Sequence, residues 1–222
     1  MDRRPALIFD LDGTLVDSVY EHVLAWRDAL ARAGIELSVW RLHRRIGMSG
    51  GLMANALLRE TGRPVASDDA ELLRRYHAEA YAELATRVRP LPGAVELLAR
   101  LTEVGTAWAI ATSGYRESAG ITIERLHVPD DAPIVTRDLV AHAKPDPDLF
   151  LAAAERLGVD IEDCVVVGDS VWDLLAARRA HALGVGVLSG GYGREELERA
   201  GAYRVYEDPA DLLRHLDELG VR

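Results

Sequence analysis

The chain has 222 residues, a formal net charge of −10 and a hydrophobic share of 49%. This length suits one domain, or one domain with a modest insertion, and the hydrophobic share is enough to form a buried core. The acidic balance disfavours nonspecific binding to nucleic acid or to an anionic membrane, although it does not exclude a phosphate ester in a local pocket. A single cysteine excludes an internal disulfide.

The first expected strand, at residues 6–9, lies too close to the first residue for a signal peptide to precede it. No uninterrupted apolar segment reaches the length of a membrane span. We therefore expect a cytoplasmic protein that binds neither nucleic acid nor membrane. The sequence leaves the oligomeric state, monomer or dimer, undetermined.

The segment at residues 8–18, Ile-Phe-Asp-Leu-Asp-Gly-Thr-Leu-Val-Asp-Ser, carries the strongest signal. Its apolar beginning predicts a buried strand that ends in Asp10 and Asp12. Because side chains alternate along a strand, both carboxylates emerge on the same side, where they repel each other unless a cation or a shared proton compensates. A hard divalent metal bound through oxygen is the natural explanation, and a plain acidic turn is the alternative.

Between about residues 18 and 88 the pattern is helical, without a convincing strand. Ser18 and Glu21 form a capping-box pattern that predicts the start of the first helix. Pro90 and Pro92 then make a stiff segment at which the chain returns to the sheet. The expected helices of this insertion cover residues 18–34, 38–46, 50–61 and 68–86.

The densest basic cluster lies within this insertion and consists of Arg41, His43, Arg44 and Arg45. A solvated helix face explains such a cluster. A positive patch that faces an anionic substrate is the functional alternative, and the sequence leaves both open.

After the insertion, short apolar runs alternate with helical patterns, which predicts a parallel sheet with helices on both faces. The expected strands cover residues 107–111, 134–135, 164–167, 185–188 and 203–206. The expected helices cover residues 94–103, 116–126, 147–157, 172–182, 194–199 and 209–219.

Ligands of an open parallel sheet bind beyond the carboxyl ends of its strands, so the remaining candidates are sought there. The sequence Thr112-Ser113-Gly114 offers hydroxyl and backbone N–H groups that suit a phosphate oxygen, or that simply cap a helix. Lys144 precedes a proline and a helix N-terminus, where a nearby anion would explain its ammonium better than a surface position does.

A further apolar run ends in Asp169, followed by Ser170 and Asp173. Ser170 and Asp173 fit a capping pattern, which is a serious alternative to a functional role for Asp173. Capping explains Asp169 poorly, because Ser170 already supplies the cap.

Residues 8–18 resemble the first signature of the haloacid dehalogenase-like hydrolases, a superfamily made up mostly of phosphatases. The helical insertion and the later strand-end motifs extend the resemblance over nearly the whole chain. It implies an α/β fold with a Rossmann-like catalytic core at residues 1–17 and 89–222. The all-helical segment at residues 18–88 would be the cap that determines substrate specificity.

The resemblance also implies the roles of the catalytic residues. Asp10 would be the nucleophile that forms an aspartyl-phosphate, and Asp12 the general acid/base. Lys144 would neutralise charge on the nucleophile and on the phosphoryl oxygens, and Thr112 would contact the transferring phosphoryl group.

The same resemblance implies a magnesium site. Mg²⁺ would be held by Asp10, the backbone carbonyl of Asp12 and Asp169, while Asp173 would ligate the metal or support its water shell. The presence of Asp12 favours phosphate monoesters over haloacids, because the dehalogenases of the family lack this second aspartate and need no magnesium.

The helical segment is similar to that of the β-phosphoglucomutase and phosphoglycolate phosphatase branches. His22 lies in a matching place, so it can touch substrate or steer Asp12, or be an ordinary surface histidine. Gly50 stands where the mutases carry an arginine that grips phosphate, which favours hydrolysis over a mutase reaction. Arg45 can compensate from nearby, and Ser49 of the same loop is a further candidate for substrate binding.

We therefore predict a Mg²⁺-dependent phosphatase that acts on a small phosphorylated metabolite, such as a sugar phosphate or phosphoglycolate. A β-phosphoglucomutase-like phosphotransferase is the alternative within the family. A phospho-accepting signalling receiver domain is a remote alternative outside it, because receivers carry no helical insertion and place their acidic pair on a different strand from the phosphorylated aspartate.

Overall fold

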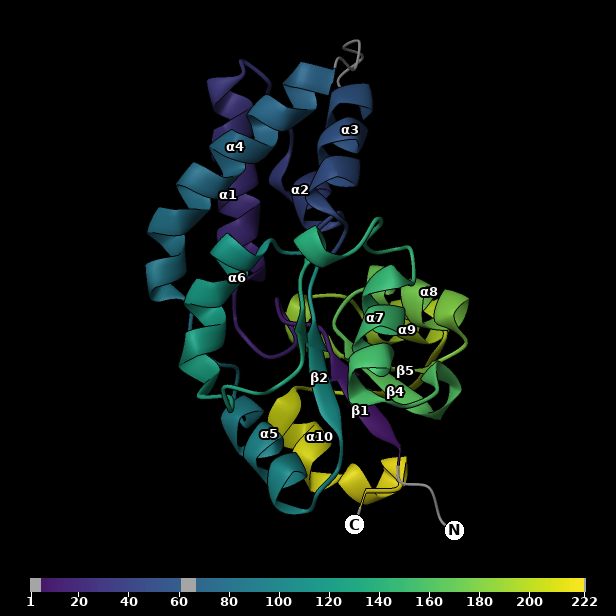
Figure 1. The fold of residues 1–222 in the computed structure, drawn as a ribbon. Helices are drawn as coiled ribbons and strands as arrows, with labels where there is room; N and C mark the ends of the chain where they lie inside the picture. Colours follow the sequence, from purple (N-terminus) through teal and green to yellow (C-terminus); the bar gives the residue numbers. More distant parts are fainter. Residues whose placement is uncertain (1–4, 61–66, 222) are drawn as a thin grey trace.

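The computed structural model describes residues 5–60 and 67–221. Six parallel strands form one sheet in the order β3-β2-β1-β4-β5-β6 (Figure 1). This arrangement confirms the predicted α/β class, and each predicted strand is present within two residues at either end. The strands are β1 (Ala6–Phe9), β2 (Trp108–Ala111), β3 (Ile134–Val135), β4 (Cys164–Gly168), β5 (Leu183–Val187) and β6 (Ala202–Tyr206).

Helices cover both faces of the sheet, as the alternating pattern predicts. Those of the sheet region are α5 (Ala94–Glu103), α6 (Arg116–Ile123), α7 (Asp148–Leu157), α8 (Val171–Ala180), α9 (Arg194–Ala200) and α10 (Pro209–Arg214).

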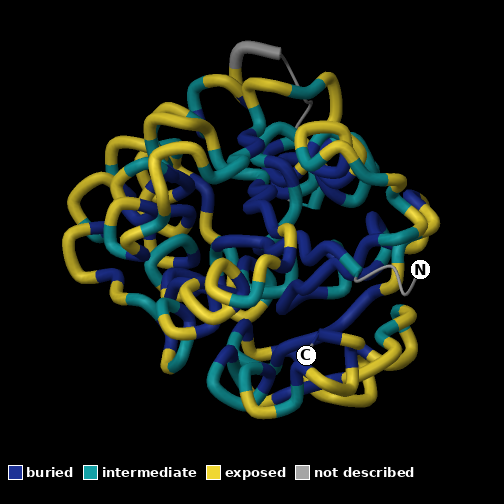
Figure 2. The backbone as a smooth tube through the Cα atoms, turned by 60° about the horizontal axis from the view of Figure 1, so that its bottom comes forward, coloured by how far each residue is buried: buried dark blue, intermediate teal, exposed yellow. Residues whose placement is uncertain are grey.

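Strand β1 lies in the middle of the sheet and is buried on both faces, which explains its continuous apolar run (Figure 2). Leu7 and Phe9 pack in the apolar layer that α5, α6 and α10 complete. Ala6 and Ile8 point to the opposite layer, formed with α7 and α8. Side chains of β1 alternate between these two apolar layers and pack on both sides of the sheet. The strand is therefore held in place, and so are the residues that follow its carboxyl end.

Four further helices lie beyond the carboxyl ends of the strands (Figure 1). They share an apolar core of their own, to which each contributes a leucine: Leu30, Leu42, Leu57 and Leu73. The helical nature of this segment agrees with the sequence, while the predicted last residue of the third helix lies outside the described residues. The helices are α1 (Val19–Arg32), α2 (Val39–His43), α3 (Gly50–Glu60) and α4 (Ser67–Leu84).

The chain crosses between the sheet and these four helices through two segments that lie side by side. The N–H of Asp17 donates to the carbonyl of Arg89 at 2.9 Å, and the N–H of Leu91 donates to the carbonyl of Leu15 at the same distance. Val16 and Pro90 form an antiparallel bridge between them. This pairing lies at the predicted boundary between a core and a cap, and we use these two terms below for the predicted division.

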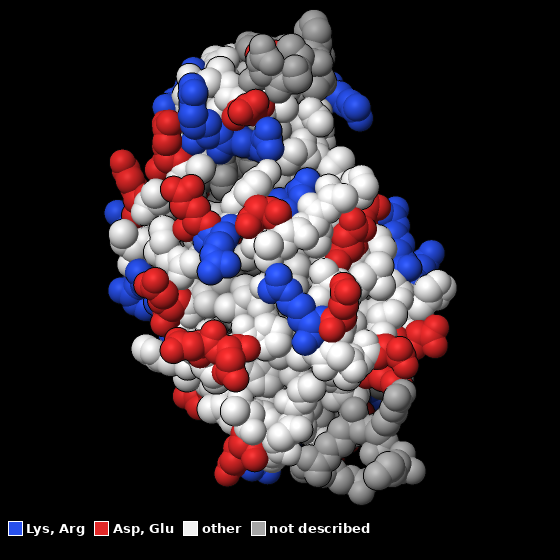
Figure 3. All heavy atoms as spheres, in the orientation of Figure 1, with Lys and Arg blue, Asp and Glu red and all other residues white. Residues whose placement is uncertain are grey.

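The surface carries mixed charge. On the face drawn in Figure 3, basic and acidic side chains are interspersed over both the helical cap and the core. Among the described helices, none combines the length and the apolar character that a membrane crossing requires.

Candidate active site

The centre of the site is a buried lysine held between two buried aspartates. Asp10 directly follows β1, and its carboxylate forms an ion pair with the Lys144 ammonium. The same Lys144 Nζ lies 2.8 Å from Oδ1 of Asp173. Lys144 is 1% exposed, and a charge buried to this degree is stable only with such partners. The structure thus brings together three residues that the sequence places far apart.

Burial and neighbouring charges shift the pKa values of this group. Burial raises the pKa of Asp10 to about 7, although the attraction of Lys144 opposes the change. Burial alone would lower the pKa of Lys144, but Asp10 and Asp173 outweigh it and hold that pKa above its usual value. The lysine is therefore a permanent cation, and it compensates only part of the negative charge around it.

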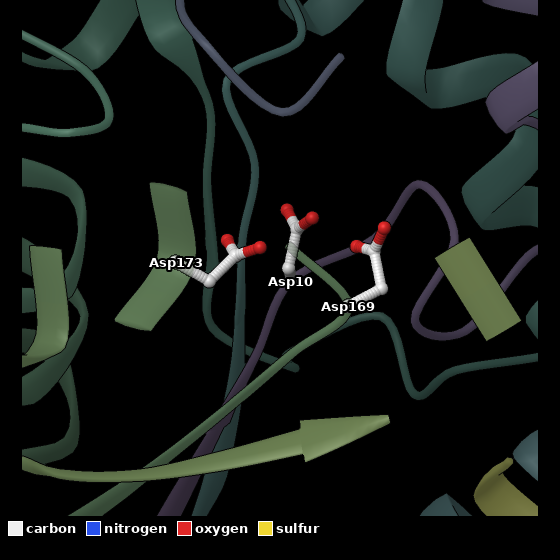
Figure 4. A group of neighbouring side chains, drawn as sticks. All are labelled: Asp10, Asp169 and Asp173. Carbon is white, nitrogen blue, oxygen red and sulfur yellow. The ribbon is translucent and has the colours of Figure 1, made fainter. Parts of the chain in front are cut away.

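A third carboxylate completes a candidate metal centre. Asp169 follows β4, and each of Asp10, Asp169 and Asp173 offers an oxygen within 4.8 Å of the others. Figure 4 shows the carboxylate of Asp10 between those of Asp169 and Asp173. Burial, together with the nearby negative charges, raises the pKa of Asp169 well above its usual value. Clustered carboxylate oxygens that lack sufficient positive charge fit a hard divalent cation such as Mg²⁺.

The surroundings of Asp169 leave little freedom for its side chain. Thr14 Oγ1 donates a hydrogen bond of 3.2 Å to Asp169 Oδ1. A Cβ atom at Gly190 would lie 1.7 Å from Asp169 Oδ2, so only glycine fits at this position. Neither Thr14 nor Gly190 is singled out by the sequence, although Thr14 stands inside the first motif.

Both oxygens of Asp173 already accept hydrogen bonds. Oδ1 accepts from Lys144, while Oδ2 accepts from the backbone N–H and the hydroxyl of Ser170, at 3.1 and 2.5 Å. The capping pattern predicted for Ser170 and Asp173 is thereby confirmed. These bonds favour a role in which Asp173 positions Lys144, and through Lys144 also Asp10, instead of ligating the metal directly.

Asp12 is held from the cap side. Ser18 Oγ donates to Asp12 Oδ1 at 2.6 Å, and His22 Nε2 lies 3.2 Å from the same oxygen. The capping box predicted for Ser18 and Glu21 is wrong, because Ser18 makes no side-chain cap bond and gives its hydroxyl to Asp12 instead. Burial would raise the pKa of Asp12, but His22 and Ser18 outweigh it and hold the pKa below its ordinary value.

A second histidine stands behind the first. His22 Nδ1 lies 3.1 Å from His77 Nε2, and both rings stack with the ring of Tyr81. Burial lowers the pKa of His77 well below the usual value, and His22 adds to this effect, so His77 is neutral. The sequence gives no signal for His77, because 55 positions separate it from His22.

The remaining predicted site residues lie where the core meets the cap. Thr112 directly follows β2, and its Oγ1 accepts a hydrogen bond of 2.9 Å from the N–H of Gly114. Ser113 Oγ donates to the carbonyl of Gly47 at 3.3 Å. The N–H of Ser49 donates to the carbonyl of Lys144 at 3.1 Å. Hydrogen bonds thus connect the loop before α3, through Gly47 and Ser49, to Ser113 and to Lys144 of the core.

The basic cluster of the cap is largely compensated by acidic residues. Arg41 and Arg45 both form ion pairs with Glu60, and Arg44 forms one with Glu196 of the core. The described contacts of Arg45 are with Glu60 and with the carbonyl of Arg41. They do not support the predicted contact of Arg45 with substrate, which stays a prediction.

Comparison with known proteins agrees with this geometry. The family profile of the haloacid dehalogenase-like hydrolases matches residues 5–181. A phosphoglycolate phosphatase of Agrobacterium fabrum is 35% identical over 190 residues, which cover 84% of this chain and 81% of the relative. Hexitol phosphatase A of Escherichia coli is 34% identical over 180 residues, which cover 80% of each chain.

Among solved structures, a hydrolase from Pseudomonas syringae is 56% identical and superposes with a TM-score of 0.94 over 96% of this chain and 98% of its own. The resemblance seen in the motifs is therefore confirmed, and a receiver domain is ruled out. The chain belongs to the haloacid dehalogenase-like hydrolases.

Proposed function

We propose that this protein is a Mg²⁺-dependent phosphatase that hydrolyses a small phosphate monoester through an aspartyl-phosphate on Asp10. The observation that carries the proposal is the convergence of Asp10, Lys144 and Asp169. A nucleophile, a fixed cation and a pair of metal-binding oxygens are the parts that phosphoryl transfer requires. The phosphatases among the relatives support a phosphorylated metabolite, such as phosphoglycolate or a sugar phosphate, as substrate.

Asp10 and Asp169, together with the backbone carbonyl of Asp12, would hold the Mg²⁺ ion. The bound ion supplies positive charge that offsets the repulsion between a carboxylate and a phosphate dianion. The clustering of buried oxygens around Asp10 supports this assignment. The hydrogen bonds of Asp173 support a positioning role for that residue.

The protein's own residues carry the reaction. The carboxylate of Asp10 attacks phosphorus in line, and the bond to the leaving oxygen breaks. Lys144 is fixed beside the nucleophile, where its charge stabilises the transferring phosphoryl oxygens. Asp12 gives its proton to the departing alcohol and then takes a proton from the water that hydrolyses the aspartyl-phosphate. The arriving dianion favours the protonated form of Asp12, because a like charge raises the pKa of a carboxyl group.

The test is release of inorganic phosphate from a panel of phosphorylated acids, sugars and polyols. We expect turnover with Mg²⁺, none with EDTA, and a loss of at least about 1,000-fold in Asp10→Asn. Asp146→Asn, which changes an exposed carboxylate paired with Arg179, should retain full activity. In Asp12→Ala, hydrolysis of the intermediate should slow, so that mass spectrometry detects a phosphoryl group on Asp10.

Full activity of Asp10→Asn, or full activity in EDTA, would contradict the proposal. Conversion of a sugar phosphate into its isomer without release of phosphate would instead identify a mutase.

A further inference from the structure

An arginine of the cap reaches the core at the edge of the site. Arg74 lies on α4, and its Nη1 donates to the hydroxyl of Tyr115 at 3.1 Å. Tyr115 follows the Thr112-Ser113-Gly114 turn at the end of β2. The second described bond of Arg74 joins its Nε to the carbonyl of Ala70 at 3.4 Å. Both partners are uncharged, and no ion pair of Arg74 occurs within the described residues 5–60 and 67–221, so none of their carboxylates compensates its charge.

This distinguishes Arg74 from other arginines of the cap. Five of them pair with glutamates, namely Arg32, Arg41, Arg44, Arg45 and Arg75. Arg44 also bridges cap and core, but its partner there is Glu196. A guanidinium has only donors and a permanent charge, and a planar pair of acceptor oxygens satisfies it best.

The stem of Arg74 lies beside Gly50, the first residue of α3. A Cβ atom at Gly50 would lie 3.8 Å from Cγ and Cδ of Arg74, which is ordinary contact distance. Gly50 directly follows Ser49, whose N–H donates to the carbonyl of Lys144. Ser49 and Gly50, at the N-terminus of α3, therefore connect Arg74 to the backbone of Lys144, whose ammonium pairs with Asp10.

A second series of contacts relates the face of α4 that carries Arg74 to Asp12. Residues 74 and 77 are three positions apart on α4, so they lie on the same side of the helix. His77 contacts His22, and His22 contacts Asp12. Because Asp12 is the proposed proton donor to the leaving oxygen, the leaving group lies on the side of the site that this face of α4 approaches.

We propose that Arg74 determines specificity by binding a carboxylate on the leaving group, which makes short phosphorylated carboxylic acids the preferred substrates over neutral polyol phosphates. The inference rests on the proposed phosphatase function. Arg74 can bind a carboxylate through two parallel hydrogen bonds. The hydroxyl of Tyr115 accepts from Arg74, which leaves its own proton for a second bond to the same group.

The test compares 2-phosphoglycolate with 2-hydroxyethyl phosphate, which has the same length but a neutral hydroxymethyl group in place of the carboxylate. We expect the wild type to prefer phosphoglycolate. Arg74→Gln should lower kcat/KM for phosphoglycolate about 10- to 100-fold, mainly through KM, because one charged hydrogen-bonding interaction is lost. For 2-hydroxyethyl phosphate the loss should stay within about threefold, and Arg74→Lys should restore part of the preference.

Arg75→Gln is the matched control, because it removes the neighbouring arginine, which pairs with Glu79. It should leave the ratio of the two substrates unchanged. Equal losses for both substrates in Arg74→Gln would overturn the proposal and leave Arg74 as a plain contact between cap and core. A wild type without preference for phosphoglycolate would overturn it as well.

Binding provides an independent measurement. In Asp10→Asn, calorimetry should show that 2-phosphoglycolate binds about 10- to 100-fold more weakly when Arg74→Gln is added. Equal affinity with and without Arg74 would overturn this inference even in a protein with full phosphatase activity. If the wild type hydrolyses no phosphate ester at all, the proposed function fails, and the binding comparison still decides the role of Arg74.

Discussion

The two halves of the site are built in different ways. In the core half, Asp10, Lys144 and Asp173 are at most 2% exposed, and they hold one another through direct ion pairs. In the cap half, His22 and Arg74 are only half-buried, and single hydrogen bonds connect them to Asp12 and Tyr115. We take this difference to separate chemistry from recognition, in line with the proposals above: the core would fix the reacting groups, and the cap would offer polar groups to a ligand.

The largest expected effect comes from the core half, where Lys144→Met removes the cation between two buried carboxylates. We expect kcat to fall by about 1,000-fold for every substrate, because the charge acts on the common phosphoryl group. The free energy of unfolding should fall by about 3–5 kcal/mol, since Asp10 and Asp173 lose their partner. Steady-state kinetics and denaturant unfolding measure the two effects.

Lys144→Arg is the matching variant for this position. A planar guanidinium does not fit the space of a compact ammonium between two carboxylates. Lys144→Arg should therefore be little more active than Lys144→Met. A variant Lys144→Met that lost activity toward phosphoglycolate alone would contradict the assignment of this half to chemistry.

An intermediate effect is expected from the boundary between the halves, where His22 contacts Asp12. His22→Ala should lower kcat/KM for alkyl phosphates about 10- to 100-fold, because proton donation by Asp12 is disturbed. For p-nitrophenyl phosphate, whose leaving group needs no proton, the loss should be only a few-fold. His142→Ala, at an exposed histidine of the core, is the control. Equal losses for both leaving groups would indicate that His22 acts on binding instead.

The smallest effect is expected from the outer contact between cap and core. Arg44 pairs with Glu196 at the surface, and such pairs contribute at most about 1 kcal/mol. Arg44→Gln should therefore leave kcat/KM and the substrate preference unchanged, in contrast to Arg74→Gln. A change of substrate ratio in Arg44→Gln would show that both bridging arginines take part in recognition.

Asp10 and Asp169 could be predicted from the sequence because each directly follows an apolar strand. Parallel strands bring their carboxyl ends to one edge, so these two aspartates converge there. Lys144 lies between β3 and α7, and its place beside Asp10 was implied by the family resemblance. The capping box of Ser170 and Asp173 was equally visible, since it depends on neighbours three positions apart.

The cap half could not be predicted in the same way. His77 meets His22 across 55 positions and Arg74 meets Tyr115 across 41, so the contacts depend on how helices rotate against one another. Arg45 shows the same difficulty, because nothing local indicates that Glu60 compensates its charge. The helix does begin after Ser18 as predicted, but the local prediction of a capping bond for this residue failed, since the half-buried Asp12 carboxylate offered its hydroxyl a better acceptor.

Lys144 is the only lysine of the chain, and every other long basic side chain is an arginine. Its ε-amino group is shielded from solvent between Asp10 and Asp173 beneath the cap. Apart from the chain terminus, amine-selective reagents therefore have one target, and both its burial and its ion pairs protect it. Acylation at this single amine should therefore be slow in the folded protein and faster on unfolding, and mass spectrometry measures it without any introduced label.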